Sequence, residues 1–267
     1  MLRDITLGQY YPVPSPVHRL DPRVKILLTF AFIVGVFFVG SPLGYVPIAL
    51  YILFASHLAG LPLKMMLRSI KPLRILLIFT FVLNLFFGSG ETQIFKLGFI
   101  RVTQEGLLNA VHFSLRLIFL VMGSSIMTLT TPPVTLTDGL ESLVSPLKVV
   151  KFPAHEMAMM MTIALRFIPT LAEEADKIMK AQTARGADFS SGNLRQRAKS
   201  LIPLLVPLFV SAFRRAGDLA MAMESRCYRG GEGRTRLHIL KAGRRDLVAV
   251  LSMVLLYAVV LVMARYV

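Results

Sequence analysis

The sequence has almost none of the residues that build a disulfide, a metal site or a nucleotide site. Cys227 is the single cysteine, which excludes an internal disulfide and a cluster of cysteine ligands. His155-Glu156 resembles the start of a zinc-protease motif, but Met159 stands where the second histidine is needed. No P-loop is present, because Gly230-Gly231-Glu232-Gly233 lacks the lysine and follows no strand-like pattern. We therefore expect no catalytic residue, no cofactor and no metal.

Charged residues are also scarce, at 17%, whereas 55% of the chain is hydrophobic and the mean hydropathy is +0.64. Residues 26–63 hold no charge, which is enough for two spans of about 20 residues, with a turn at residues 40–44. Further uncharged runs cover 75–90 and 247–264, and 106–137 is interrupted only by Arg116. Residues 200–213 contain Pro203 and Pro207 and have basic flanks, so we expect them to be amphipathic and not spanning. The pattern predicts an all-α integral membrane protein with about five transmembrane helices.

The basic residues fix the expected orientation. With the N-terminus inside, 26 of the 30 lysines and arginines are cytoplasmic, and only Lys96, Arg101 and Arg265 lie outside. This topology explains the net charge of +15 better than nucleic-acid binding does. We expect a multi-pass protein of the cell membrane in contact with the lipid bilayer, with a cytoplasmic N-terminus and an external C-terminus. Its parts are a membrane domain over 1–131, a cytoplasmic domain over 132–246 and a last transmembrane helix over 247–267.

Three cytoplasmic helices are expected between the fourth and fifth spans. The first opens with a capping box at residues 135–138 and ends near Pro146. The second runs from about His155 to Thr183, with Pro169 as a kink. The third runs from about Asn193 to Ser225 and approaches ~50 Å in length.

The last two helices end in similar tripeptides, each an arginine between two small residues. These are Ala184-Arg185-Gly186 and Ser225-Arg226-Cys227. Small neighbours allow a backbone to enter a groove, and a guanidinium offers five donors to a partner protein. An arginine at a helix end can also simply complement the helix dipole. Spacing alone leaves both interpretations open.

Several runs of sequence resemble the transmembrane component of energy-coupling factor transporters. They are Tyr10, Ser15, His18-Arg19-Leu20-Asp21-Pro22-Arg23-Val24-Lys25, Pro153-Ala154-His155-Glu156, Leu165-Arg166-Phe167-Ile168-Pro169, Glu173-Glu174-Ala175, Ala181-Gln182-Thr183-Ala184-Arg185-Gly186 and Ala222-Met223-Glu224-Ser225-Arg226-Cys227-Tyr228. The resemblance covers nearly the whole chain. The second arginine motif departs from the commonest form, since Ser225 replaces Ala and Cys227 replaces Gly.

The resemblance implies a non-catalytic coupling subunit of an ABC-type uptake transporter in a bacterial or archaeal membrane. Two ATPase subunits would each seat one arginine tip, and a substrate-binding membrane S component would capture a vitamin or a metal ion. A membrane peptidase, suggested by Glu173-Glu174, is the alternative, and a channel or secondary transporter ranks last because no internal repeat is evident. Arg116, inside the fourth span, is either functional or a buried hydrogen-bond hub.

Overall fold

The computed structural model describes residues 10–87, 93–97, 100–150, 152–187, 189, 193, 195, 199–231 and 240–266. They form two compact units. The described residues within Gly8–Leu140 and Ile239–Val267 make up the first unit, and those within Glu141–His238 make up the second. These units are defined by contacts within the fold, whereas the predicted boundaries at 131/132 and 246/247 separate membrane from cytoplasm. The predicted boundaries therefore stay a prediction.

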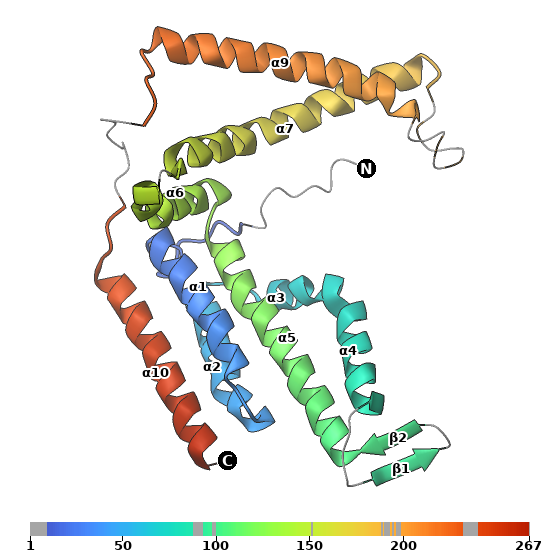
Figure 1. Cartoon of the computed structure of the whole chain (residues 1–267), viewed down its shortest axis with the longest axis vertical. Coiled ribbons are helices and arrows are strands. Elements are labelled where there is room, and N and C mark those ends of the chain that lie inside the picture. Colours follow the sequence, from blue (N-terminus) through green and yellow to red (C-terminus); the bar gives the residue numbers. More distant parts are fainter. Residues whose placement is uncertain are drawn as a thin grey trace. The chain divides into compact units, whose positions relative to one another are not determined.

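The first unit is a helix bundle. Helices α1 (Pro22–Phe37), α2 (Tyr45–Leu58), α5 (Gln104–Thr130) and α10 (Arg244–Tyr266) pack together, and α4 (Arg74–Phe87) packs along α5 (Figure 1). The predicted turn between the first two spans is confirmed, because α1 ends before residues 40–44 and the 3₁₀ turn η2 (Pro42–Gly44) leads into α2. The core between the helices includes Val36, Ile48, Ile52 and Leu129, all essentially inaccessible.

Two glycines let helices of the bundle approach closely. The ring of Tyr257 on α10 occupies the place where a side chain on Gly35 of α1 would lie, and Phe32 does the same at Gly123 of α5. The Tyr257 hydroxyl donates to the carbonyls of Ala31 and Phe32 at 3.2 and 3.1 Å. Small residues at close helix contacts are typical of membrane proteins, where packing and hydrogen bonds replace the hydrophobic effect.

The outer surface of the bundle is apolar. Ile75 on α4 is 78% exposed, and Leu255 and Leu261 on α10 are each 66% exposed. Among the described residues, three helical runs are long and apolar enough to cross a membrane, namely Leu63–Phe86, Gln104–Thr130 and Arg244–Arg265, and Pro42–Leu58 is apolar but shorter. The predicted class, an all-α membrane protein, is confirmed.

Some details differ from the sequence predictions. The run 106–137 is not one helix, because α5 ends at Thr130 and α6 (Pro133–Val144) begins after Pro132. A short antiparallel hairpin, β1 (Gln93–Leu97) with β2 (Ile100–Thr103), connects α4 to α5. The segment after α2 forms the short helix α3 (Leu63–Ile70) and the 3₁₀ turn η3 (Lys71–Leu73).

The predicted capping box at Thr135 is wrong. Thr135 lies inside α6, and its hydroxyl donates to the carbonyl of Pro132 at 2.8 Å. Helix α6 starts two residues earlier because Pro133 already has the φ angle that a first helical residue needs. The 3₁₀ segment η4 (Ser145–Val150) follows it.

Two long helices dominate the second unit. Helix α7 (Ala154–Ala184) has 31 residues and Pro169 inside it, and its length is about 46 Å. Helix α9 (Ile202–Ser225) has 24 residues, about 36 Å. Residues 195, 199 and 200 of the predicted helix are helical too, but Leu201 interrupts it before α9. Helix α9 begins at Ile202 with Pro203 in its first turn, a position that favours helix initiation. Parts of the predicted start, residues 194 and 196–198, lie outside the described residues.

Candidate docking sites at the ends of the two long helices

Helix α7 ends in a Schellman motif that places Arg185 on its last turn. The Gly186 amide donates to the Thr183 carbonyl and the Ala187 amide to the Gln182 carbonyl, both at 3.0 Å. Gly186 has a φ of 87°, a left-handed conformation that costs glycine little. A side chain at this position would meet no atom within 4 Å, so the backbone conformation and not space requires glycine.

Helix α9 ends in the same motif. The Cys227 amide donates to the Glu224 carbonyl at 2.9 Å, and the Tyr228 amide donates to the Met223 carbonyl at 3.0 Å. Cys227 has a φ of 56° and is the one residue other than glycine with a positive φ in the part of the chain that the structure describes. Arg226 therefore occupies the same place relative to its helix end as Arg185.

The six residues predicted for docking are all exposed: Ala184, Arg185, Gly186, Ser225, Arg226 and Cys227. The guanidinium groups of Arg185 and Arg226 make no hydrogen bond or ion pair with any other residue that the structure describes. Both are free to contact another protein. The two helices run in opposite directions, so the arginines lie at opposite ends of the pair (Figure 1).

The contact between α7 and α9 combines one ion pair with a loosely filled apolar interface. Arg215 Nη2 donates to Glu174 Oε2 at 2.8 Å. Hydrogen bonding from the Ser211 hydroxyl, and the charge of Arg215, lower the pKa of Glu174 from its ordinary value. Ala212, Ala216 and Ala220, four residues apart on α9, line a cavity of about 300 Å³ with Ile163, Phe167 and Leu171 of α7.

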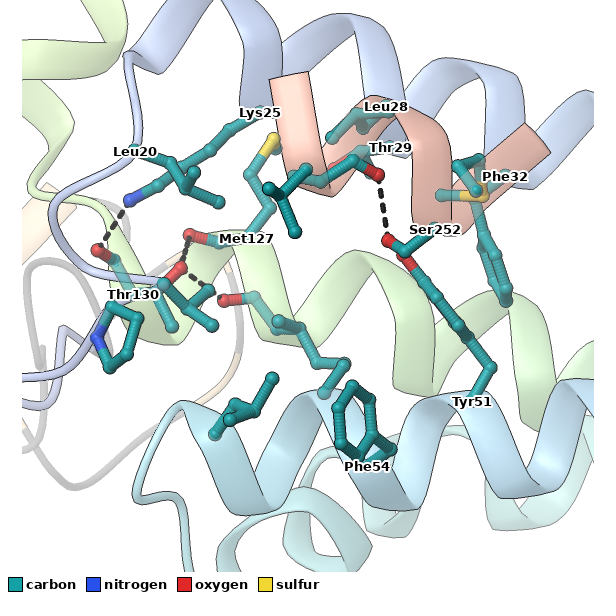
Figure 2. Close-up of a pocket in the computed structure, with 18 of the residues that line it drawn as sticks. Leu20, Lys25, Leu28, Thr29, Phe32, Tyr51, Phe54, Met127, Thr130 and Ser252 are labelled. Carbon is teal, nitrogen blue, oxygen red and sulfur yellow. Dashed lines mark hydrogen bonds between the residues drawn. The ribbon is translucent and has the colours of Figure 1, made fainter. Parts of the chain in front are cut away.

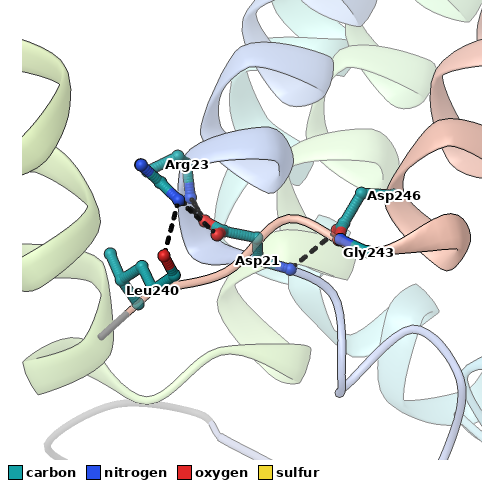
Figure 3. Close-up of polar contacts among 5 residues, drawn as sticks. All are labelled: Asp21, Arg23, Leu240, Gly243 and Asp246. Carbon is teal, nitrogen blue, oxygen red and sulfur yellow. Dashed lines mark hydrogen bonds and ion pairs between the residues drawn. The ribbon is translucent and has the colours of Figure 1, made fainter. Parts of the chain in front are cut away.

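The N-terminal motif has a structural role that the sequence did not indicate. Asp21 caps α1 and forms an ion pair with Arg23 at 2.8 Å, and this partner lowers the pKa of Asp21 (Figure 3). Arg23 donates to the carbonyl of Leu240 at 3.1 Å, and the Asp21 amide donates to Asp246 Oδ1 at 2.8 Å. Asp246 Oδ2 accepts from the Gly243 amide at 2.7 Å. The motif thereby joins the start of α1 to the start of α10.

Lys25 extends these contacts to the end of α5. Its ammonium group, buried with the side chain, donates to the His18 carbonyl at 3.2 Å, the Thr130 carbonyl at 3.1 Å and the Thr131 hydroxyl at 3.0 Å. His18 Nε2 donates to the Tyr11 carbonyl at 2.9 Å. All three donors of the ammonium are used, which allows its burial.

Arg116 is the centre of a hydrogen-bond network inside the bundle. Its Nε donates to the Tyr45 hydroxyl at 3.3 Å, and its Nη2 donates to the Val39 carbonyl at 3.2 Å and lies 2.8 Å from His112 Nε2. Its guanidinium also stacks over Phe113, 5.3 Å from the ring centre. These contacts are the ones that the hub interpretation predicts.

These features define a membrane protein of the all-α class whose exposed arginine tips suit docking to another protein. The cobalt transport protein model, CbiQ, matches residues 14–237. The energy-coupling factor transporter transmembrane protein EcfT of Thermosediminibacter oceani is 57% identical over 266 residues, covering all of both chains. The EcfT proteins of Acidaminococcus fermentans and Bacillus subtilis are 56% and 45% identical, each covering 96% or more of both chains. This chain belongs to the CbiQ/EcfT family of transporter transmembrane components.

Proposed function

We propose that this chain is the non-catalytic coupling subunit of an energy-coupling factor transporter. It would join two cytoplasmic ATPases of the ABC type to a substrate-binding S component that captures a vitamin or a metal ion. The observation that carries the proposal is the structural identity of the two helix ends, with Arg185 and Arg226 at equivalent positions of two Schellman motifs. Two equivalent docking ends fit two homologous ATPase subunits.

The chemistry of each end suits insertion into a groove. The exposed residues beside Arg185 are Ala184 and Gly186, and those beside Arg226 are Ser225 and Cys227, so the backbone can approach a partner closely. The free guanidinium supplies donors for carboxylates or carbonyl oxygens in that groove. The positive charge of each arginine also stabilises its helix by complementing the negative end of the helix dipole. An arginine can do this and bind a partner at the same time.

The arrangement of the helices suits a mechanical role. Two ATPases that hold opposite ends of the α7–α9 pair would change the angle between the helices when they close on ATP. The interface between the helices has alanines on one side and a cavity of about 300 Å³, so fewer interlocking side chains oppose such a movement. The Glu174–Arg215 ion pair would keep the two helices in register.

Exposed apolar side chains on these two helices offer a surface for the S component. They include Met160 at 60%, Phe209 at 61%, Phe213 at 75% and Met221 at 63% exposed. Methionine is flexible and polarizable, which suits contact with partners of different shape. The S component would then select the substrate. The N-terminus and the arginine tips would be cytoplasmic and the C-terminus external, in agreement with the distribution of basic residues.

The test is co-purification of the tagged chain with both ATPases and the S component. Arg185→Ala and Arg226→Ala should each weaken ATPase retention, and the double variant should retain neither ATPase. A central interfacial arginine typically contributes about 2 kcal/mol or more, which corresponds to roughly a thirtyfold loss of affinity. Arg214→Ala, an exposed arginine within α9, is the matched control. Wild-type yields of both ATPases with the double variant would refute docking through these residues.

A further inference from the structure

A cavity of about 420 Å³ opens between α1, α2, α5 and α10 of the first unit. Its wall is almost entirely apolar, with Leu28 and Phe32 from α1, Phe54 from α2 and Met127 from α5 turned toward it (Figure 2). The Tyr51 hydroxyl, which also lines it, lies within hydrogen-bond distance of Ser252 Oγ, at 3.4 Å. The volume falls in the range of about 300 to 1,000 Å³ that is usual for small-molecule sites.

The charged residues that line the cavity are Lys25, Arg244 and Arg245. Lys25 has no free donor, because its ammonium is bound by three oxygens of the protein, one of which belongs to Thr130 (Figure 2). Arg244 and Arg245 are exposed, and within the described ranges neither has a hydrogen bond or an ion pair from its side chain. The neighbouring carboxylate of Asp246 does not pair with them, because it accepts hydrogen bonds from the backbone amides of Asp21 and Gly243. Two unpaired positive charges therefore stand at the rim of an apolar cavity.

The position of the arginines along α10 matches a membrane boundary. Eighteen uncharged residues, 247–264, follow Asp246 directly, so the arginines lie two and three positions before the apolar part of the span. By the distribution of basic residues this is the cytoplasmic end, where anionic lipids attract lysine and arginine side chains. A transmembrane helix, about 10 Å across, is too wide for a cavity of this volume, whereas an acyl chain needs no hydrogen-bond partner in an apolar wall.

We propose that this cavity binds an acyl chain of one anionic phospholipid, whose phosphate pairs with Arg244 and Arg245. An acyl chain gains little by moving from the bilayer into an equally apolar cavity, so the preference for this lipid comes from its headgroup. Each arginine near the surface contributes about fivefold in affinity toward an anionic headgroup. The site lies in the bundle and is independent of the arginine tips of α7 and α9.

The experiment is titration of the purified, delipidated full chain in mild detergent, followed by native mass spectrometry. The probes are dioleoyl phosphatidylglycerol, dioleoyl phosphatidylcholine and inorganic phosphate. We expect one phosphatidylglycerol per chain, bound at least tenfold more tightly than phosphatidylcholine. Arg244→Gln with Arg245→Gln should weaken phosphatidylglycerol binding about 25-fold and phosphatidylcholine binding much less, because the choline ammonium of that lipid offsets its phosphate charge. The matched control, Lys64→Gln with Arg68→Gln, removes two exposed charges from α3 and should retain the site.

Ala249→Phe tests the cavity separately, because Ala249 lines it and a phenyl ring would fill part of it. This variant should lose the bound phosphatidylglycerol even if the arginine variant does not fold. Equal affinity of the wild type for both lipids would overturn the proposal, as would unchanged lipid binding by Ala249→Phe. Inorganic phosphate that binds as tightly as phosphatidylglycerol would identify a free-anion site and also overturn it.

Discussion

Gly186 and Cys227, which end α7 and α9, both have a left-handed backbone conformation. Replacing the glycine should therefore destabilise its helix end, whereas introducing a glycine in place of the cysteine should stabilise the other. An L-residue in this conformation costs about 1–2 kcal/mol, and replacing glycine by alanine recovers about 0.4–1 kcal/mol by restricting the unfolded chain. Gly186→Ala, at a φ of 87° and with no atom within 4 Å of the new Cβ, should therefore destabilise the helix end by about 0.5–1 kcal/mol. Cys227→Gly, at a φ of 56°, should stabilise the other end by a similar amount.

Amide hydrogen exchange of the purified chain measures both effects locally. The amides of Ala187 and Tyr228 close the two motifs by donating to Gln182 and Met223. A change of 0.5–1 kcal/mol corresponds to an exchange rate about two to five times faster at Ala187 in Gly186→Ala, and slower by the same factor at Tyr228 in Cys227→Gly.

Gly217→Ala is the matched control, since Gly217 is exposed inside α9 and its Cβ would also meet no atom within 4 Å. In a helix interior the same substitution should stabilise, by about 0.8–1 kcal/mol. If Gly186→Ala and Gly217→Ala changed protection in the same direction, the left-handed conformation would not be the reason for glycine at position 186.

Three further predictions concern the polar contacts of the bundle. Lys25→Met should lower stability by about 1–3 kcal/mol in a detergent melting experiment, because buried oxygens lose their donor, whereas exposed Lys64→Met should stay within about 0.5 kcal/mol. Burial lowers the pKa of His18 below its ordinary value of about 6.5, so the unfolded chain binds a proton at a higher pH than the folded chain does. The stability that neutral His18 contributes should therefore be fully present above about pH 6.5 and should decrease as the pH falls below it. His18→Gln should remove this acid dependence. Arg116→Met should lower stability by about 1–3 kcal/mol without changing transport per folded complex, and a full loss of transport by a stably folded variant would contradict the hub interpretation.

The sequence was enough to predict that the membrane helices and the two long helices exist, but not to predict where several of them begin. The uncharged runs identified α1, α2, α4, α5 and α10 because a bilayer admits few charges, and the motif around Arg185 located the end of α7 through Gly186. The start of α6 was wrong, because Pro133 initiates the helix through a backbone preference that hydrophobic spacing does not register. The predicted third helix is interrupted at Leu201, just before Pro203, although residues 195, 199 and 200 of its predicted start are helical.

The membrane class, the family and the two arginine tripeptides could be recognised from the sequence, because charge distribution and local motifs can be read along the chain. The left-handed conformation of Cys227, equivalent to that of Gly186, is visible only in the structure, since a cysteine carries no local signal for it. Tertiary structure alone decided that Lys25 bonds residues 105 and 106 positions away and that Asp21 meets Asp246 across 225 positions. Such contacts depend on which helices become neighbours, and that is fixed only when the whole bundle packs.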